Sequence, residues 1–450
     1  MTSRWANADD DAELEAQRQK QKAQKRTLKE EKQRKLEDVK IAEHQQAIAE
    51  EPEPSKKRQR TASPSQETAK EDAHLIEFPS PSYAPSRSLD LYQVLNNIEE
   101  GSYGFVSRAK LKVSGDIVAL KRLKLDHRSQ EGFPVTGLRE IQTLWACSHP
   151  HIVKLREVIV GSEPVQDVYI VMDFLEHDLK TILEDMDDPF SPSETKTLMQ
   201  QICSATEYLH SNWIMHRDLK TSNLLLNNRG EIKLADFGMA RYTSNPPPKL
   251  TQLVVTLWYR APELLLGVEE YGFEIDVWSI GCIFAELLTQ EPIFQGKNEV
   301  GQLFAIFNLL GTPTRESWPG FRSLPNAKAL HPLLSNSQSS KSNLTASKFP
   351  YLTKAGLRLL LSTLSLDPND RPSASQILQH PYLKEDPRPK AKEMFPTFPS
   401  KAGQERRRRR LTPQAPDRGE APKMEAGDFA SIFARSSEEQ SGGGFALRMG

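Results

Sequence analysis

The stretch that decides the fold is the run His216-Arg217-Asp218-Leu219-Lys220-Thr221-Ser222-Asn223, followed by Leu234-Ala235-Asp236-Phe237-Gly238. An Asp in a loop is usually a turn former, so one carboxylate alone would carry little information. Here, however, Asp218 could accept the proton of a hydroxyl group and orient it for attack. Asn223 and Asp236 add the hard oxygen ligands that Mg²⁺ prefers. Phosphoryl transfer needs little beyond this alignment of an alcohol, a phosphate and metal ions.

Upstream lies a candidate phosphate cradle, Ile98-Glu99-Glu100-Gly101-Ser102-Tyr103-Gly104-Phe105-Val106. Glycine lacks a Cβ, so a strand-turn-strand with two glycines lets the backbone approach phosphate groups closely. Taken alone, Gly-x-x-Gly is more often an ordinary hairpin turn. The apolar strand Val118-Ala119-Leu120-Lys121 follows, and its lysine would be either an exposed edge-strand charge or a phosphate ligand.

A short helix is predicted next, because Leu138, Ile141 and Leu144 recur at helical spacing. Glu140 lies within this helix and can pair with Lys121, which would hold the lysine ammonium on the α- and β-phosphates of ATP. The pair forms only when the helix is rotated inward. It would therefore act as a switch as well as a ligand.

In this order and spacing the motifs do not fit ordinary turns, and residues 91–383 resemble a eukaryotic protein kinase. The sequence also resembles the cyclin-dependent kinase group and its PITSLRE branch, through Pro134-Val135-Thr136-Gly137-Leu138-Arg139-Glu140 and Glu393-Met394-Phe395-Pro396-Thr397-Phe398-Pro399. The resemblance implies an ATP- and Mg²⁺-dependent serine/threonine kinase. It implies an α+β fold of two lobes, with a small antiparallel sheet and one helix at 91–173, a larger helical lobe at 174–383, and ATP between them.

The resemblance also assigns roles to single residues. Catalysis falls to Asp218 and to Lys220, which would reach the γ-phosphate, and Mg²⁺ binding falls to Asn223 and Asp236. The residues that would contact the nucleotide are Ile98, Gly101, Gly104, Val106, Ala119, Lys121, Met172, Asp173, Leu175 and Leu225. The residues with structural roles are Glu263 and Arg371, as an ion pair, and Asp276, as a brace for the backbone of the catalytic loop.

Regulation is implied as well. A bound cyclin, of L type in this branch, would hold the helix carrying Glu140 inward, and Thr251 would carry an activating phosphate. Ser102 and Tyr103 match positions of inhibitory phosphorylation, where a phosphate would repel those of ATP. Guanidinium groups pair bidentately with phosphate. The residues that match the family's phosphate-gripping arginines are Arg139, Arg217 and Arg241.

One position departs from the family pattern, because Glu99 stands where the kinase glycine loop begins with Gly. Two glycines and all catalytic positions remain, so an inactive kinase is not inferred. A weakly active scaffold that recruits partners through its tails stays an alternative. A second alternative is a mitogen-activated-type kinase that needs no cyclin. Such kinases carry Thr-x-Tyr in the activation segment, whereas Thr251 is followed by Gln252-Leu253.

The resembled family phosphorylates Ser or Thr followed by Pro. Val254-Val255 and Trp258-Tyr259-Arg260 would form an apolar pocket for that proline, which has no N–H to satisfy. We therefore expect Ser/Thr-Pro sites as substrates. The branch further implies nuclear substrates in transcription, pre-mRNA processing or cell-cycle control.

Outside this core the chain is polar. Residues 1–87 carry abundant charge and few aromatic side chains, so they should stay disordered or form a transient helix. Such a helix, at Ala12–Glu50, would be either solvated or partner-binding. An extended polar tail is expected at 384–450. The basic runs Lys56–Arg60 and Arg406–Arg410 could be nuclear import signals, nucleic-acid patches or solvated charge. The branch favours the nucleus and allows a cytoplasmic pool.

The composition of the chain excludes several other classes of protein. The 450 residues have a formal net charge of -1 and 37% hydrophobic content, which suits a core flanked by polar segments. No run approaches the roughly 18 consecutive apolar residues of a membrane span. The cysteines are scattered and odd in number, so neither a disulfide framework nor a clustered zinc site is expected. We expect a soluble protein of a reducing compartment, with no membrane partner and no direct nucleic-acid partner.

Overall fold

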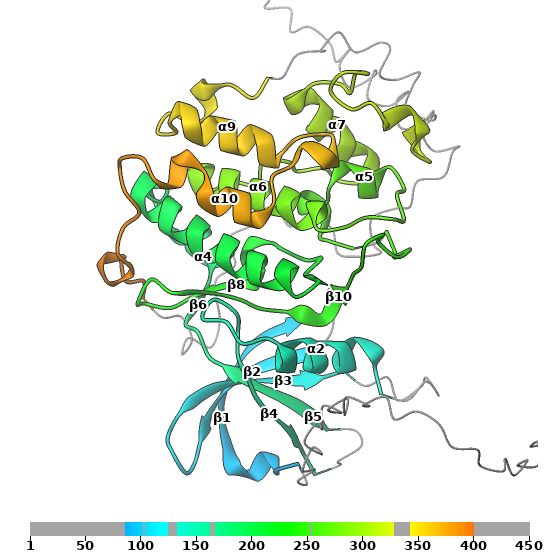
Figure 1. The fold of residues 1–450 in the computed structure, drawn as a ribbon. Coiled ribbons are helices and arrows are strands. Elements are labelled where there is room, and N and C mark those ends of the chain that lie inside the picture. Colours follow the sequence, from blue (N-terminus) through cyan, green and yellow to red (C-terminus); the bar gives the residue numbers. More distant parts are fainter. Residues whose placement is uncertain are drawn as a thin grey trace, which may run out of the picture. The chain divides into compact units, whose positions relative to one another are not determined.

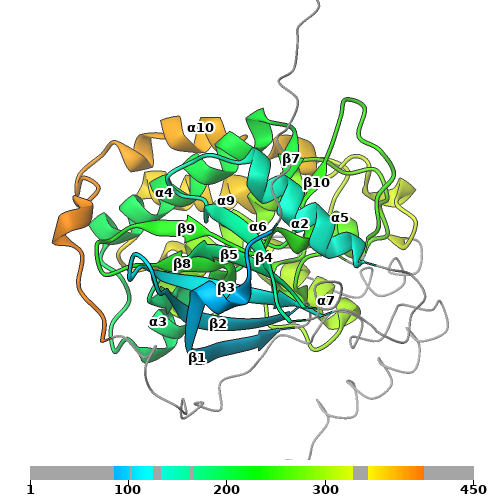
Figure 2. The same ribbon diagram turned by 90° about the horizontal axis from the view of Figure 1, so that it is seen from below.

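The small lobe of the computed structural model is a five-stranded antiparallel sheet of order β1-β2-β3-β5-β4 (Figures 1 and 2). Its strands are β1 (Tyr92–Gly101), β2 (Gly104–Leu111), β3 (Ile117–Leu123), β4 (Leu155–Val160) and β5 (Val168–Asp173). β-Branched and aromatic residues are frequent in them, and these fit a pleated, half-buried surface. The two-lobed α+β fold expected from the sequence is confirmed.

The structure describes residues 86–101, 104–124, 133–162, 167–252, 254–327 and 343–399. All of them belong to one unit, Tyr83–Gly450. The predicted helix at Ala12–Glu50, both basic runs and the two glycine-loop phosphosites, Ser102 and Tyr103, lie outside the described residues.

Strand β3 sets the position of Lys121. Val118 and Leu120 are buried in a cluster on one face of the sheet. Successive side chains of a strand point to opposite faces, so Ala119 and Lys121 share the other face. Lys121 lies opposite Val106 of β2 in the antiparallel register, which brings the lysine and the glycine-containing hairpin together.

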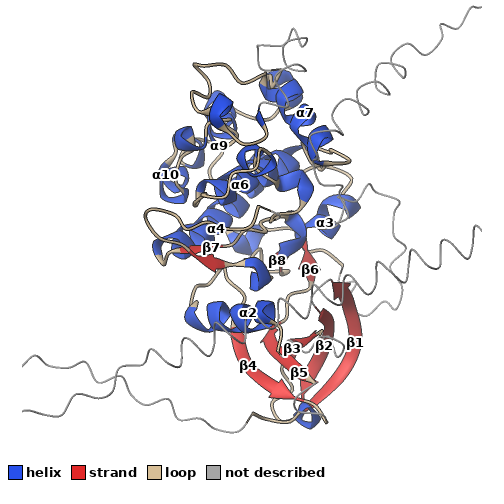
Figure 3. Ribbon diagram, turned by 90° about the vertical axis from the view of Figure 1, so that its right-hand side faces the viewer, coloured by secondary structure: helices blue, strands red, loops and turns tan. Residues whose placement is uncertain are grey.

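Helix α2 (Val135–Ala146) lies between the sheet and the large lobe (Figures 1 and 3). Glu140 and Leu144 are buried on it, at 1% and 2% exposure. Leu138, which the spacing placed on the same apolar face, is instead 52% exposed. The reason is that Glu140, a charged residue, belongs to the inward face through its contact with Lys121. With 3.6 residues per turn, a face containing positions 140 and 144 turns Leu138 outward.

Helices make up most of the large lobe, as Figure 3 shows. They are α3 (Leu179–Asp185), α4 (Pro192–Ser211), α5 (Pro262–Leu265), α6 (Glu274–Thr289), α7 (Glu299–Leu310), α9 (Lys354–Thr363) and α10 (Ala374–Gln379). Helix α6 is buried nearly all round and forms the centre of the core. Ser191 begins α4 with a capping box to Glu194. Among the described residues, no helix combines the length and apolar character needed to cross a membrane.

Short strands in the large lobe flank residues 216–223 and Asp236. A three-stranded sheet of order β6-β8-β9 contains β6 (His177–Asp178), β8 (Leu224–Leu226) and β9 (Ile232–Leu234). A second pair joins β7 (Ile214–Met215) to β10 (Arg241–Tyr242). Beyond the last large-lobe turn, residues 384–399 run along α4 and the β8–β9 turn, and Phe395 in this segment is only 7% exposed.

Candidate active site

The loop that carries Asp218 follows β7 and is held by the start of α6. Asp276, at 1% exposure, accepts hydrogen bonds from the backbone N–H groups of His216 and Arg217, each at 2.9 Å. Arg217 has a left-handed φ of 64°, which is costly for a residue with a side chain and persists because its surroundings fix it. Burial opposes the ionisation of Asp276, but contacts with His210 and the loop outweigh it and lower the pKa of this carboxyl.

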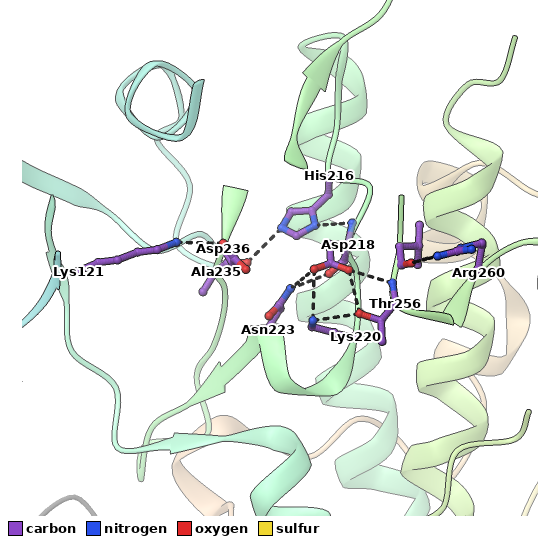
Figure 4. Close-up of polar contacts among 10 residues, drawn as sticks. Lys121, His216, Asp218, Lys220, Asn223, Ala235, Asp236, Thr256 and Arg260 are labelled. Atoms are coloured by element: carbon purple, nitrogen blue, oxygen red, sulfur yellow. Dashed lines mark hydrogen bonds and ion pairs between the residues drawn. The ribbon is translucent and has the colours of Figure 1, made fainter. Parts of the chain in front are cut away.

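Three neighbours orient the carboxylate of Asp218, which is 4% exposed (Figure 4). Its Oδ1 accepts hydrogen bonds from the backbone N–H and the hydroxyl of Thr256, at 3.1 and 3.2 Å. Its Oδ2 lies 3.3 Å from Lys220 Nζ and accepts a 3.3 Å hydrogen bond from Asn223 Nδ2. Lys220 Nζ also donates to Thr256 Oγ1 at 3.0 Å. The structure thus brings together the three loop residues that the sequence assigned to one site.

The proposed metal ligands have the donor chemistry that Mg²⁺ requires. Asn223 donates through Nδ2 to the backbone oxygen of Asp218 at 2.8 Å, which leaves its Oδ1 as the oxygen for a cation. Asp236 supplies a carboxylate. Within the described ranges, no three His, Cys, Asp or Glu side chains group as a metal site. Mg²⁺ commonly takes one or two protein oxygens together with substrate phosphates, so this pair fits a nucleotide-bound ion.

A second ion-pair group reaches this site from the small lobe. Lys121 Nζ lies 2.6 Å from Glu140 Oε1 and 3.0 Å from Asp236 Oδ1. Burial opposes the charge of Lys121, but Asp236 and Glu140 outweigh it and raise the pKa of the ammonium. Burial likewise opposes ionisation of Asp236, yet Lys121 lowers the pKa of its carboxyl to about 2. Asp236 is therefore ionised at neutral pH, as a cation ligand must be.

His216 supports the same loop in its neutral form. Burial lowers the pKa of its imidazole, which is fully enclosed. Its Nδ1 accepts a hydrogen bond from the backbone N–H of Asp218 at 3.3 Å, so the ring proton lies on Nε2 and is donated to the carbonyl oxygen of Ala235 at 3.1 Å. The histidine thereby joins the Asp218 loop to the residue preceding Asp236.

The nucleotide-contact residues expected from the sequence come from both lobes. Ala119 and Met172 lie opposite each other on β3 and β5, and Leu225 lies on β8. Ile98 on β1 is 38% exposed. Leu175 is buried in the connection after β5, next to Asp173 at the strand end. A Cβ on Gly104 would stand 2.3 Å from the carbonyl oxygen of Arg122, so only glycine fits between β2 and β3 here. Gly101 faces Gly104 across the β1–β2 pair.

Thr251 lies exposed in the activation segment, where a modifying enzyme can reach it. Its carbonyl oxygen accepts a 2.6 Å hydrogen bond from the hydroxyl of Tyr271, which in turn accepts one from Arg217 at 2.7 Å. Arg241 donates to the carbonyl oxygen of Ala240, and Arg139 lies half-buried on α2. Tyr271 therefore links Thr251 to one of the three expected phosphate-gripping arginines, a role that the sequence analysis missed.

The segment after Thr251 ends in an unusual backbone turn at Val255. Its φ is 62°, a left-handed value that β-branched residues rarely adopt. The guanidinium of Arg260 donates to the carbonyl oxygens of Val254 and Val255, at 2.9 and 3.0 Å, and pairs with Glu299 at 2.7 Å. The carbonyl of Val255 is thus engaged by Arg260.

A buried cluster joins the catalytic loop to this segment. Glu286 on α6 accepts hydrogen bonds from Thr221 Oγ1 at 2.9 Å and from the Tyr259 hydroxyl at 2.7 Å. Burial raises the pKa of Glu286 to about 7, although both hydrogen bonds oppose the shift. Sequence reasoning missed Glu286 and Thr256 as site-supporting residues. The sequence offered only weak signals for them: a charged residue within an apolar helix, and a Thr two positions before Trp258.

An ion pair holds helix α5, which follows the activation segment, to the rest of the large lobe. Arg371 donates to both carboxylate oxygens of Glu263, at 2.6 and 2.8 Å, and both side chains are buried. The Arg371 guanidinium also lies 4.9 Å from the ring of Trp278. A bidentate Arg–carboxylate contact fixes geometry as well as charge, so the end of the activation segment is held to the core.

Comparison with known proteins agrees with this geometry. The protein kinase domain model matches residues 92–383. The chain is 53% identical over 324 residues to the serine/threonine-protein kinase ppk23 of Schizosaccharomyces pombe, covering 72% of this chain and 80% of that protein. It is 48% identical over 343 residues to Homo sapiens cyclin-dependent kinase 11B, covering 75% of this chain and 42% of that protein.

Two further matches point the same way. The cyclin-dependent kinase G-2 of Oryza sativa subsp. japonica is 49% identical over 339 residues, which are 74% of this chain and 46% of that protein. The crystal structure of the yeast RNA Pol II CTD kinase CTDK-1 complex matches with a TM-score of 0.62 and 36% identity, covering 70% of this chain and 100% of that chain. The matched region is less than half the length of the human and rice relatives. The chain belongs to the protein kinase family, as a serine/threonine kinase of the cyclin-dependent kinase group.

Proposed function

We propose that this chain, with a cyclin bound, transfers the γ-phosphate of ATP to Ser or Thr hydroxyls that precede Pro. One observation carries the proposal: Asp218 is held by Thr256, Lys220 and Asn223, while Lys121 joins Asp236 to the small lobe. This arrangement offers an acceptor for a hydroxyl proton beside cationic groups for phosphates. Both are needed for in-line phosphoryl transfer.

In the proposed reaction, Asp218 accepts a hydrogen bond from the substrate hydroxyl and takes its proton. The hydroxyl oxygen forms a bond to the γ-phosphorus while the bond to the β,γ-bridging oxygen breaks, and ADP leaves. Lys220 and Lys121 stabilise negative charge on the γ- and on the α- and β-phosphates. Asn223 and Asp236 would hold Mg²⁺, which would neutralise phosphate charge.

The preference for proline rests on Val255 and Arg260. The carbonyl of Val255 is bonded to the Arg260 guanidinium, so it is not offered to an incoming peptide. A residue with an N–H placed against this turn would lose a hydrogen bond to water without gaining one from the protein. Proline has no N–H and avoids that cost.

The cyclin proposal rests on the outer face of α2. Val135, Leu138 and Trp145 are 56%, 52% and 75% exposed, respectively. Their spacing places them along one side of the helix, which is typical of a surface that a partner covers. A partner bound there would hold the inner face, with Glu140, against Lys121. The names of several relatives include cyclin-dependent kinase, and an L-type cyclin is the partner proposed from the branch resemblance.

We further propose that phosphorylation of the chain regulates its activity. A phosphate on Thr251 would be gripped by Arg139, Arg217 and Arg241, and phosphates on Ser102 or Tyr103 would inhibit. We also propose nuclear substrates in transcription, pre-mRNA processing or cell-cycle control, with the basic runs as import signals. A fluorescent fusion that stays cytoplasmic with both tails intact would count against the nuclear location.

The deciding experiment compares the wild type with Asp218→Asn, each with and without a purified L-type cyclin, on peptides that differ only as Ser-Pro or Ser-Ala. We expect cyclin-stimulated activity that is higher on Ser-Pro than on Ser-Ala, and its loss in Asp218→Asn. Full activity without a cyclin would instead favour the mitogen-activated-type reading. Equal activity of the two proteins would overturn the role of Asp218, and no activity in either would favour a scaffold.

A further inference from the structure

Residues 385–399, here called the C-terminal strap, lie beyond the region matched by the kinase family model, which ends at 383. They are nevertheless fixed to the large lobe by side-chain contacts along their length (orange in Figure 1). The strap has almost no regular structure, with a single turn at Lys392–Met394. It is therefore held by its anchors and not by a hydrogen-bond ladder of its own.

The first anchor is a buried lysine of α4. Lys196 is 0% exposed, and its ammonium donates to the carbonyl oxygens of Glu385 and Pro387, at 2.9 and 2.8 Å. The same ammonium lies 4.7 Å from the ring centre of Tyr382. A buried charge without hydrogen-bond partners is costly, so the strap backbone satisfies an ammonium that is enclosed when the strap is in place.

Two strap lysines then follow the lobe surface. Lys390 Nζ pairs with Glu194 at 2.8 Å, and the Lys390 carbonyl oxygen accepts a 2.7 Å hydrogen bond from Thr197. Lys392 Nζ pairs with Glu231 at 2.5 Å, just before β9. The contacts of Lys390 place the strap along α4, and the contact of Lys392 places it at the turn between β8 and β9.

Aromatic residues form the last anchor. Phe395 is buried, and its ring centre lies 6.4 Å from that of Phe190. The ring of Phe398 packs edge-on against His177 of β6 at 6.0 Å, and its backbone N–H donates to Asn228 Oδ1 at 2.8 Å. Gly230 between these contacts has a φ of 72°, and a Cβ there would lie 2.4 Å from the carbonyl oxygen of Lys392. The turn and the strap are thus fitted closely to each other.

The elements that the strap contacts also carry the nucleotide site. Sheet β6-β8-β9 has His177 on β6, Leu225 on β8, and Asp236 two residues after β9. We propose that the C-terminal strap is a positioning element for this sheet and thereby sets the affinity of the kinase for its nucleotide. A pocket that is ordered for only a fraction of the time binds its ligand more weakly by that fraction. This inference rests on the proposed function, because it assigns the nucleotide to this sheet.

A charge-reversal pair in the full chain tests the proposal. Lys392→Glu places like charges beside each other at the β8–β9 turn, and Glu231→Lys in the same protein restores attraction. Both side chains are partly exposed, at 49% and 29%, so these variants should fold. We expect the Kd for ADP with Mg²⁺, measured by calorimetry, to rise by about three- to tenfold in Lys392→Glu and to recover in the double variant. The KM for ATP should rise equally, with kcat at saturating ATP unchanged.

Arg388→Glu is the matched control, because Arg388 is a strap cation whose side chain is 73% exposed and which pairs with the strap's own Asp386. It should leave the Kd for ADP unchanged. A Kd for ADP within twofold of wild type in Lys392→Glu would overturn the proposal, whatever happens to the Tm. A wild-type chain that binds no ADP would overturn the proposed function itself, which distinguishes the two failures.

Discussion

Lys121 and Glu140 meet at 2.6 Å across the small lobe, with side chains only 9% and 2% exposed. The pair couples the position of α2 to the lysine that would bind phosphates. Removing one partner of a buried pair leaves the other charge poorly compensated, at a cost of about 3 to 5 kcal/mol. Here Asp236 remains beside Lys121 and should soften that cost.

We therefore expect Glu140→Gln to keep the fold but to lower kcat/KM for ATP by about tenfold or more, since Lys121 loses its link to α2. Steady-state kinetics and thermal unfolding measure the two effects. Glu291→Gln, at an exposed position, is the control and should change neither. Unchanged kinetics in Glu140→Gln would contradict the role of the pair.

The hydroxyl of Thr256 should contribute to kcat, because it contacts both Asp218 and Lys220. Thr256→Ala removes the two hydrogen bonds and should lower kcat by about tenfold, while the KM for ATP stays nearly constant. Thr256→Ser keeps the hydroxyl and should recover most of the activity. If Ser and Ala were equally impaired, the methyl group and not the hydroxyl would be the important part.

Val255 should set the proline preference through its left-handed backbone. Wild type should favour Ser-Pro over Ser-Ala peptides by about fivefold or more, the cost of an unsatisfied N–H being about 1 to 3 kcal/mol. In Val255→Gly the backbone is free to turn its carbonyl toward the peptide, so the ratio of kcat/KM values should fall toward one. Peptide kinetics on the pair of substrates give the ratio. A ratio that stays at the wild-type value would rule this explanation out.

Glu286 should make stability depend on pH. Its pKa is raised to about 7 in the folded chain from an ordinary value of 4.5. Between these values the unfolded state loses its proton first, so this group's contribution to stability is present at low pH and is lost as pH rises toward 7. The full window corresponds to about 3 kcal/mol, at about 1.4 kcal/mol per unit.

Glu286→Gln has no proton to lose, so the difference in free energy of unfolding between variant and wild type should shift in favour of the variant from pH 5 to pH 7. Urea unfolding at several pH values measures this difference. A difference that is constant with pH would show that Glu286 does not titrate in this window.

On α2, Trp145 should be a main contact for the proposed cyclin. Trp145→Ala should weaken cyclin binding by about thirtyfold, as large aromatic residues often do at interfaces, without lowering the Tm of the free chain. Calorimetry of the two proteins measures the affinity. Equal affinity for cyclin would place the interface elsewhere.

The sequence predicted the family and the two-lobed fold, and both are confirmed. It also named Asp218, Lys220 and Asn223, because they stand in the contiguous run 216–223 that carries the resemblance to protein kinases. Among contacts between distant positions, the Glu263–Arg371 pair was expected only through the family resemblance, and Glu286 was missed. Glu286 meets Thr221 across 65 positions, and no local pattern signals such a contact.

Two other features show why tertiary packing was not predictable from the sequence. Leu138 looked like a core residue by spacing, yet the inward face of α2 is defined by Glu140 and its distant partner Lys121. Residues 384–450 were expected to form an extended polar tail, yet residues 385–399 pack against the large lobe. The aromatic anchor Phe395 is buried only because Phe190, some two hundred positions earlier, offers it a surface.

The exposure of Trp145 has a practical consequence. Indole emission shifts to shorter wavelengths when water is removed from the ring. Trp258, Trp278 and Trp318 are all buried, and Trp213 is 49% exposed, so Trp145 at 75% is the most solvated indole among the described residues. Binding of a cyclin to α2 should therefore shift the intrinsic tryptophan fluorescence to shorter wavelengths, so the complex can be detected without an attached dye.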